Sequence, residues 1–257
     1  MPPASDGAFA AWLAERTGQM LQGLRDDMGF GDPAALRAAG DKSAHDLLVT
    51  ELGRWRAADA VLSEEGVPDD PARLSNERVW IVDPLDGTRE FGEPGRSDWA
   101  VHVALWSQKA MSLVAGAVAL PAASLVLSTD PVPSYPPMHP SVAAGGPIRI
   151  AVSRTRPPSF LSELAEEVHA VAVPMGSAGA KIAAVITGDV DAYIHAGGQS
   201  EWDSAAPVAV ALSAGLHASR IDGSRLIYNR LDPSLPDLIV CRADLAHRLL
   251  SALSHRR

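Results

Sequence analysis

The chain has 257 residues, of which 47% are hydrophobic and 21% charged, and its formal net charge is −9. This composition is typical of a globular protein with enough apolar residues for one large core or two smaller ones. The acidic balance and the lack of a basic block argue against a nucleic-acid polymer as partner. The single cysteine, Cys241, excludes an internal disulfide and a zinc–thiolate cluster, which fits a reducing compartment.

The N-terminal segment lacks the basic and apolar regions of a secretory signal, and its apolar residues fall on one helical face. Residues 110–128 are uncharged and almost long enough to span a bilayer. Pro121 interrupts this run, however, and the pattern favours a buried hairpin with strands at 112–120 and 123–128. We therefore expect a cytoplasmic protein that does not span a membrane.

The first half of the sequence predicts helices and then mostly consecutive strands. The helices are expected at about 6–27 and 40–57, and the strands before the hairpin at 60–62, 79–83 and 99–106. Pro84 cannot donate to a sheet ladder, so the strand that begins at Val79 is expected to end at Asp83. Residues 99–106 alternate between two apolar faces, as expected of a strand that is covered on both sides.

Residues 131–147 are dense in proline and glycine, which predicts a linker without regular structure. After it, strands and helices alternate: strands at 148–152, 169–173 and 190–194, and helices at 159–168, 177–187 and 204–214. The first half is therefore predicted to be α+β and the second α/β. We expect two subdomains, 1–130 and 148–257, with a ligand-binding cleft between them.

Carboxylates occur repeatedly where these elements begin or end. The segment VWIVDPLDGTRE places two aspartates on a tight turn directly after a buried strand. Taken singly, each acidic residue can be a turn residue, a helix N-cap or a solvated loop charge. Together they suit a hard divalent cation, which prefers oxygen ligands and can bridge to a phosphate. The residues concerned are Asp41, Glu64, Asp83, Asp86 and Asp203.

Three motifs carry a resemblance to a known family. They are SEE at 63–65, DPLDGT at 83–88 and WDSAA at 202–206, in this order along the chain. With them the sequence resembles the lithium-sensitive, magnesium-dependent phosphatase superfamily, which includes inositol monophosphatases, fructose-1,6-bisphosphatases and 3′(2′),5′-bisphosphate nucleotidases. The resemblance implies a layered αβαβα fold and Mg²⁺, two or three ions per active site.

Details of the motifs resemble the bacterial bisphosphate nucleotidase branch of that superfamily. VLSEEG precedes the WIVDPLDGTREF segment, and Arg89-Glu90-Phe91 stands where inositol phosphatases more often have Thr-Asn-Phe. This branch implies removal of the 3′-phosphate of adenosine 3′,5′-bisphosphate, and activity on the related phosphosulfate, in sulfate assimilation. The partner would then be a small phosphorylated nucleotide, and the protein a monomer or homodimer.

The resemblance also implies a role for each acidic residue. Glu64, Asp83 and the carbonyl of Leu85 would hold one Mg²⁺, while Asp83, Asp86 and Asp203 would hold a second. Thr88 would position the attacking water and would itself be oriented by Asp41, with Glu64 also counted as catalytic. The family's threonine in the acidic segment near the second helix is absent here, so Asp46 stays open as the alternative to Asp41.

Substrate-binding residues are expected from both halves. Gly87, Thr88 and Arg89 precede or begin a short helix whose N–H groups can bind phosphate. The resemblance adds candidates from the second half: Ser153, Arg154, Ser177, Lys181 and Glu201. Ser177 can equally be an N-cap, and Lys181 a solvated helix lysine.

Two alternative functions stay open. Within the enzyme class, these are an inositol monophosphatase or a fructose-1,6-bisphosphatase. In another class, the chain would be an inactive phosphatase fold that senses a metal or a nucleotide. No G-x-S-x-G or G-x-x-x-x-G-K-[ST] motif is present, which argues against a serine hydrolase and a P-loop kinase.

Overall fold

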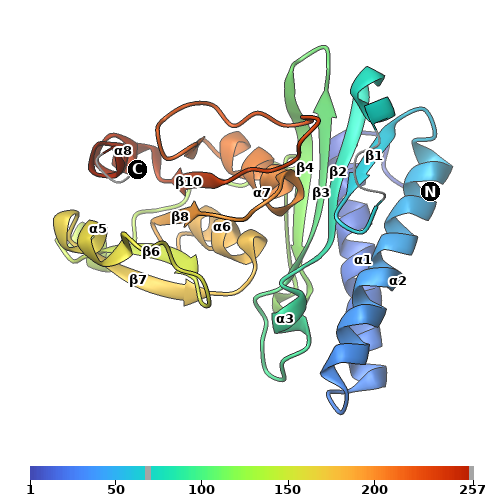
Figure 1. The fold of residues 1–257 in the computed structure, drawn as a ribbon, viewed down its shortest axis with the longest axis horizontal. Helices are drawn as coiled ribbons and strands as arrows, with labels where there is room; N and C mark the ends of the chain where they lie inside the picture. The colour runs from blue at the N-terminus through green and yellow to red at the C-terminus, as the bar shows by residue number, and fades with distance from the viewer. Residues whose placement is uncertain (67–70, 255–257) are drawn as a thin grey trace.

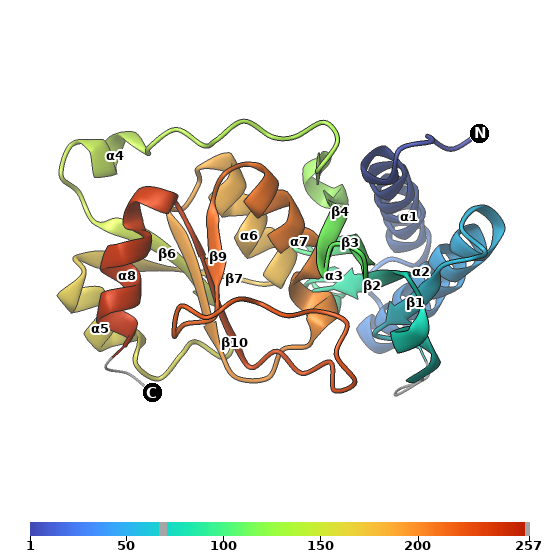
Figure 2. The same ribbon diagram turned by 90° about the horizontal axis from the view of Figure 1, so that it is seen from above.

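The computed structural model describes residues 1–66 and 71–254. Residues 67–70 and 255–257, which the predicted subdomains include, lie outside the described part. Two five-stranded sheets stack with helices between them and on both outer faces, so the layers run α, β, α, β, α (Figures 1 and 2). The predicted layered α/β fold is confirmed.

The first sheet has its strands in sequence order, β1 to β5. They are β1 (Ala60–Ser63), β2 (Arg78–Asp86), β3 (Ala100–Ser107), β4 (Ser112–Leu120) and β5 (Leu125–Ser128). Only the β1–β2 pair is parallel, and the other neighbours are antiparallel. The long helices α1 (Asp6–Met28) and α2 (Pro33–Trp55) cover the outer face, and the one-turn helix α3 (Thr88–Phe91) follows β2.

The second sheet has the order β7-β6-β8-β10-β9. Its strands are β6 (Ile148–Ser153), β7 (Ala170–Met175), β8 (Ala192–Ala196), β9 (His217–Ser219) and β10 (Asp237–Cys241). β6, β7 and β8 are parallel to one another, so their carboxyl ends meet at one edge. The helices α6 (Ala178–Thr187) and α7 (Glu201–Ser213) fill the middle layer, while α5 (Leu161–Glu167) and α8 (Ala246–Leu253) cover the outer face (Figure 1).

Period-two patterning places each residue of the central strands in one of three apolar cores. In β2, Trp80 and Val82 are buried against α1 and α2, whereas Val79 and Ile81 belong to the core shared with α6 and α7. β3 alternates in the same way, as its sequence predicts. A third core lies beneath α5 and α8.

β2 runs three residues beyond its predicted end at Asp83. Asp83 is paired with His102 and Asp86 with Ala100, so the register shifts between these positions. Pro84 therefore lies in a β-bulge, where its missing N–H breaks no ladder hydrogen bond. The bulge carries both aspartates on one continuous strand rather than on a turn after it.

The second helix, α2, starts seven residues before its predicted start, because Asp32 caps the helix and Pro33 is its first residue. The Asp32 side chain accepts hydrogen bonds from the backbone N–H groups of the next turn, and Pro33 occupies the first helical position. Gly40, which suggested a helix start, lies inside α2. A Cβ there would lie 2.7 Å from Phe91 Cε1 and 2.9 Å from Leu85 Cδ2, so glycine permits a close approach of α2 to the DPLDGT segment.

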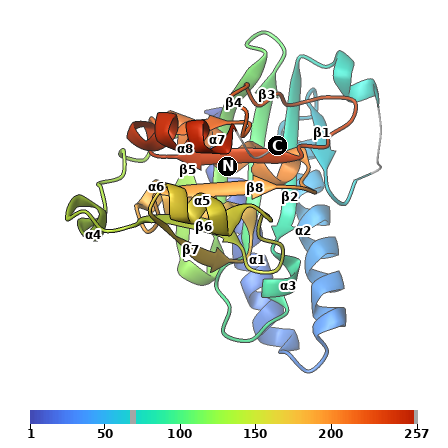
Figure 3. The same ribbon diagram turned by 60° about the vertical axis from the view of Figure 1, so that its left-hand side comes forward.

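Three further predictions differ from the structure. α7 begins at Glu201 instead of residue 204, so Asp203 lies in its first turn and Ser200 is the N-cap. The proline-rich segment contains one helical turn, α4 (Pro140–Ala143), in the chain that joins the two sheets (Figures 2 and 3). No element was predicted beyond residue 214, where β9, β10 and α8 lie.

The apolar run at 110–128 forms the predicted hairpin of β4 and β5, which are antiparallel neighbours joined at the short 3₁₀ turn Pro121–Ala123. Among the described residues, no helix has both the length and the apolar character that crossing a bilayer requires.

We expect Gly40→Ala to lower the free energy of unfolding by about 1–2 kcal/mol, because the added methyl group overpacks the contact with Leu85 and Phe91. The matched control is Gly53→Ala in the same helix, where a Cβ meets no atom within 4 Å. That variant should gain about 0.5–1 kcal/mol from helix propensity. Urea denaturation of both variants tests this, and equal effects would contradict the role of Gly40.

Candidate active site

A cavity of about 220 Å³ lies where the DPLDGT segment faces the carboxyl ends of β6, β7 and β8. In open parallel sheets this edge is where ligands bind. The predicted site residues that line the cavity are Glu64, Asp83, Leu85, Asp86, Gly87, Thr88, Arg89, Ser153, Arg154, Ser177, Lys181 and Asp203. The cavity therefore brings together residues from both halves of the chain.

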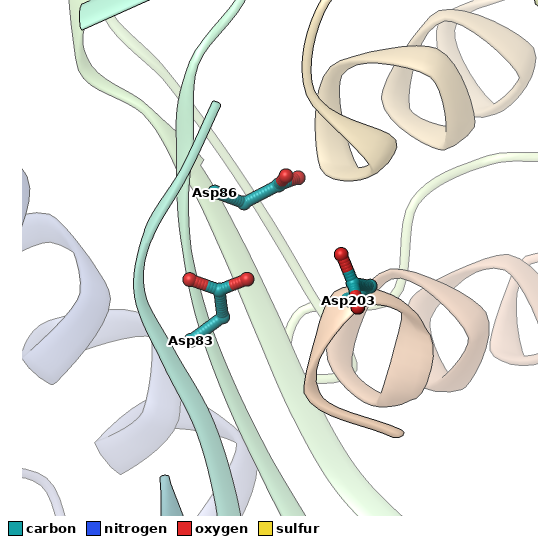
Figure 4. Close-up of side chains that lie close together, drawn as sticks. All are labelled: Asp83, Asp86 and Asp203. Atoms are coloured by element: carbon teal, nitrogen blue, oxygen red, sulfur yellow. The ribbon is translucent and has the colours of Figure 1, made fainter. Parts of the chain in front are cut away.

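Three aspartates converge on this cavity. Asp83 and Asp86 come from β2 and Asp203 from the first turn of α7, and their side chains point toward one another (Figure 4). One carboxylate oxygen from each lies within 4.8 Å of the others. An all-oxygen donor set of this kind fits a hard divalent cation.

Each of the three carboxylates accepts one backbone N–H and keeps an oxygen for a ligand. Asp83 Oδ1 accepts from Leu85 N at 3.1 Å, and Asp86 Oδ2 accepts from Gly179 N at 2.7 Å. Asp203 Oδ2 accepts from Ser200 N at 2.7 Å, within the capping box of α7. These bonds fix the three side chains in the orientation that a cation requires.

Burial and mutual repulsion make full ionisation of the cluster unfavourable. Burial, together with repulsion from Glu64 and Asp86, raises the pKa of Asp83 well above its ordinary value. Burial and repulsion from Asp86 raise the pKa of Asp203 to about 6. A bound cation would offset this repulsion and let all of the carboxylates ionise.

The pKa of Asp86 shifts in the opposite direction, because the buried His102 faces its carboxylate. His102 Nδ1 lies 3.0 Å from the carbonyl oxygen of Trp202 and therefore carries a hydrogen, while Nε2 lies 3.3 Å from Asp86 Oδ2. Burial alone would raise the pKa of Asp86, but His102, Lys181 and the Gly179 N–H together outweigh it and hold the pKa at about 2. Asp86 thus stays ionised without a metal.

Glu64 follows β1, and the parallel pairing of Ser63 with Val82 puts Glu64 beside Asp83 at the end of the sheet. The charge of Glu64 contributes to the raised pKa of Asp83, so the two carboxyl groups favour a proton on one of them. Burial and repulsion from Asp203 raise the pKa of Glu64 to about 7. Glu64 lines the cavity but is not one of the three carboxylates whose oxygens lie within 4.8 Å of one another.

Thr88 Oγ1 lies 3.2 Å from Asp41 Oδ1 and 3.0 Å from the carbonyl oxygen of Leu85. Burial and repulsion from Glu65 raise the pKa of Asp41 to about 6. Asp46, the alternative left open by the sequence, forms an ion pair with Lys42 at 2.7 Å and its side chain is 57% exposed. The geometry therefore associates Asp41 with Thr88.

The predicted residues of the second half fall into different environments. Ser177 is the N-cap of α6 and accepts from Ala180 N at 2.8 Å, yet it still lines the cavity. Lys181 is not a solvated lysine: it is 3% exposed, its Nζ contacts the Gly176 carbonyl oxygen, and it lies 5.2 Å from the centre of the Tyr193 ring.

Arg154 and Glu201, two of the predicted substrate-binding residues, form hydrogen bonds with other protein groups. Arg154 Nη2 donates to Glu90 at 2.6 Å and to Glu93 at 3.0 Å, so its charge is already paired. Glu201 does not line the cavity: it is fully buried, and its carboxylate accepts from the backbone N–H groups of Asn229 and Arg230. Glu201 therefore anchors the segment before β10 and does not face the cavity, contrary to its predicted substrate role.

Sequence reasoning overlooked the cavity wall that follows β8. Tyr193 and His195 of β8 and Gly198 and Gln199 after it line the cavity, and so does Arg156 after β6. The second-half candidates came from the family resemblance, whereas the position of β8 at the same sheet edge was a signal that could have found these residues.

Comparison with known proteins agrees with this geometry. Residues 31–256 match the sequence profile of the inositol monophosphatase family. The 3′-phosphoadenosine 5′-phosphate phosphatase of Mycobacterium leprae is 51% identical over 97% of this chain and 93% of the relative. Its namesake from Mycobacterium tuberculosis is 54% identical over 92% and 89%, and the 3′(2′),5′-bisphosphate nucleotidase CysQ of Escherichia coli is 28% identical over 74% and 78%.

Solved structures share the fold. Inositol monophosphatase II from Staphylococcus aureus superposes with a TM-score of 0.79 at 22% identity, over 96% of this chain and 93% of that one. CysQ from Bacteroides thetaiotaomicron gives 0.75 at 22% identity, over 91% and 95%. The protein belongs to the inositol monophosphatase family, so the resemblance predicted from the three motifs is confirmed. The family is metal-dependent, and the three-aspartate cluster could hold the metal.

We expect the metal-free protein to lose stability as the pH rises through the range in which Asp203 titrates. Its pKa is 3.8 in the unfolded chain and about 6 in the fold, so the unfolded chain releases the proton first. In chelator, Asp203→Asn should therefore melt at the parent's temperature near pH 4 and several degrees above it at pH 8.

Addition of Mg²⁺ at pH 8 should raise the melting temperature of the parent and leave that of Asp203→Asn nearly unchanged. The asparagine retains an acceptor for Ser200 N, so the helix cap is preserved. A constant difference between parent and variant across the pH range would contradict the electrostatic reading of the cluster.

Proposed function

We propose that the protein is a Mg²⁺-dependent phosphatase that removes the 3′-phosphate of adenosine 3′,5′-bisphosphate and releases AMP. The observation that carries the proposal is the cluster of Asp83, Asp86 and Asp203 beside Thr88, at one end of a cavity with cationic walls. The names of the relatives at 51–54% identity support the substrate.

The residues present fit two Mg²⁺ ions. Asp83, Asp86 and Asp203 would hold one, and Glu64, Asp83 and the Leu85 carbonyl another; a third ion would need further oxygen ligands from substrate and water. Bound Mg²⁺ supplies positive charge against both the carboxylates and the phosphate. The ion count and the identity of the metal are part of the proposal.

The chain's own groups position the reactants. Thr88 Oγ1 lies between Asp41 and the Leu85 carbonyl, so the hydroxyl can donate to one of them and accept a hydrogen bond from a water molecule. Asp41 can take the proton that this chain of hydrogen bonds releases. Gly87, with φ of +85°, is the N-cap of α3, and the N–H groups at the start of this helix would donate to phosphate oxygens.

Cations of the cavity wall suit an anionic substrate with more than one phosphate. Lys181, Arg156 and the exposed Arg89 line the cavity in addition to the paired Arg154. Such residues attract a bisphosphate more strongly than a monophosphate. This electrostatic balance supports the nucleotidase reading over the inositol monophosphatase alternative.

A substrate panel tests the proposal. We expect Mg²⁺-dependent phosphate release from adenosine 3′,5′-bisphosphate to exceed that from inositol 1-phosphate and fructose 1,6-bisphosphate. Chelator or Asp83→Ala should abolish release from all three. Preference for inositol 1-phosphate would overturn the substrate assignment, and no release from any of them would favour the inactive sensor. Adding the related phosphosulfate to the panel tests whether it is a second substrate.

Paired aspartate variants test the role of Asp41. Asp41→Asn should lower kcat about a hundredfold, because Thr88 loses its proton acceptor. Asp46→Asn, five residues further along the same helix, should retain parental kcat because Asp46 contacts only exposed Lys42 among the described residues. Steady-state kinetics with the nucleotide distinguish the two, and equal losses would refute the assignment.

A further inference from the structure

The cavity wall formed by β8 and the loop after it contains two polar side chains with unpaired atoms. His195 Nε2 and Gln199 Oε1 are buried and have no hydrogen-bond partner among the described protein atoms. Both residues line the cavity, and His195 is 5% exposed. Because buried polar atoms normally find partners, unpaired atoms in the wall of a binding cavity indicate that a ligand completes them.

The amide of Gln199 is held by a neighbour. Its Nε2 donates to the Tyr193 hydroxyl at 3.0 Å, and Tyr193 is itself fully buried beneath Lys181. Amide oxygen and nitrogen can exchange places by a flip, but either way one of them contacts Tyr193 and the other stays free. Gln199 therefore offers one oriented acceptor or donor.

His195 is uncharged at neutral pH. Burial lowers its pKa to about 4, with further lowering by Lys181 and Arg156, against the opposing effects of the Gly197 backbone and Asp237. A neutral imidazole has one donor and one acceptor nitrogen. It contributes hydrogen bonding at this wall but no positive charge for a phosphate, which Lys181 and Arg156 supply instead.

Arg154, another residue of the cavity wall, also has an unpaired atom, Nε, but this atom belongs to a charged side chain. Its guanidinium is charged and already paired with Glu90 and Glu93. Among the described residues that line the cavity, unpaired atoms of uncharged side chains are thus confined to His195 and Gln199.

We propose that His195 and Gln199 form an uncharged subsite that hydrogen-bonds the hydroxyl or amine groups of the substrate's nucleoside and so determines specificity for a nucleotide. This inference rests on the proposed function. It assigns the phosphates to the carboxylate-held metal and the cations, and the sugar or base to the wall that follows β8.

Two apolar variants of similar size, His195→Phe and Gln199→Leu, test the subsite in the full-length chain. Each should raise the KM for adenosine 3′,5′-bisphosphate and the Ki for the product AMP about tenfold, the effect of losing one hydrogen bond. The kcat and the Ki for inorganic phosphate should stay within about twofold of the parent. His195→Gln, which keeps a polar atom at a similar reach, should recover most of the loss.

His217→Phe is the matched control, because this histidine lies on β9 and outside the cavity lining. It should leave all four constants unchanged. Melting temperatures of every variant show whether the fold is retained. If the Ki for AMP stays at the parental value in both cavity variants, or rises together with the Ki for phosphate, the subsite is refuted.

Substrate analogues identify the recognised group. 2′-Deoxyadenosine 3′,5′-bisphosphate lacks the sugar hydroxyl, and inosine 3′,5′-bisphosphate lacks the amine of the base. The analogue without the recognised group should bind the parent about tenfold more weakly, and this penalty should vanish in His195→Phe or Gln199→Leu. A penalty that persists in both variants for both analogues refutes the inference. Failure of the proposed function looks different: the parent itself would then prefer a non-nucleotide substrate.

Discussion

Electrostatic repulsion among three neighbouring aspartates is the constraint on which the rest of the structure depends. Asp83, Asp86 and Asp203 hold oxygens within 4.8 Å in a largely buried place, which a fold tolerates only with compensating groups. Three backbone N–H groups and the imidazole of His102 supply part of the compensation. Protons on Asp83 and Asp203, whose pKa values are raised, or a bound cation can supply the remainder.

The donors of those N–H groups come from elements far apart in the chain. Leu85 lies in the β2 bulge, Gly179 in α6 and Ser200 before α7. The cluster therefore forms only when the two sheets are stacked. Gly179 also lets α6 approach closely, since a Cβ there would lie 2.1 Å from His102 Nε2. The three-aspartate end of the cavity and the wall formed by the second sheet are consequently built together.

Two predicted element boundaries were wrong at residues that other elements pack against or pair with. Gly40 was predicted to start the second helix, but it lies within α2, where Leu85 and Phe91 pack closely against it. Pro84 looks like a strand end, but the bulge accommodates it within β2. In both cases the contacting residues are distant in sequence or belong to a neighbouring strand, and no local pattern reports them.

By itself the sequence determined the alternating faces of β3 and the acidic and hydroxyl groups of the DPLDGT, SEE and WDSAA motifs, and through these motifs the family resemblance that implied the layered fold. These properties depend on residue type and short spacing, which the chain carries directly. Only the tertiary structure decided that Asp41 rather than Asp46 faces Thr88, that Glu201 anchors a loop, and that His195 and Gln199 line the cavity. Each of those outcomes depends on which distant elements pack together, because a side chain's partners are set by packing geometry and not by its neighbours in sequence.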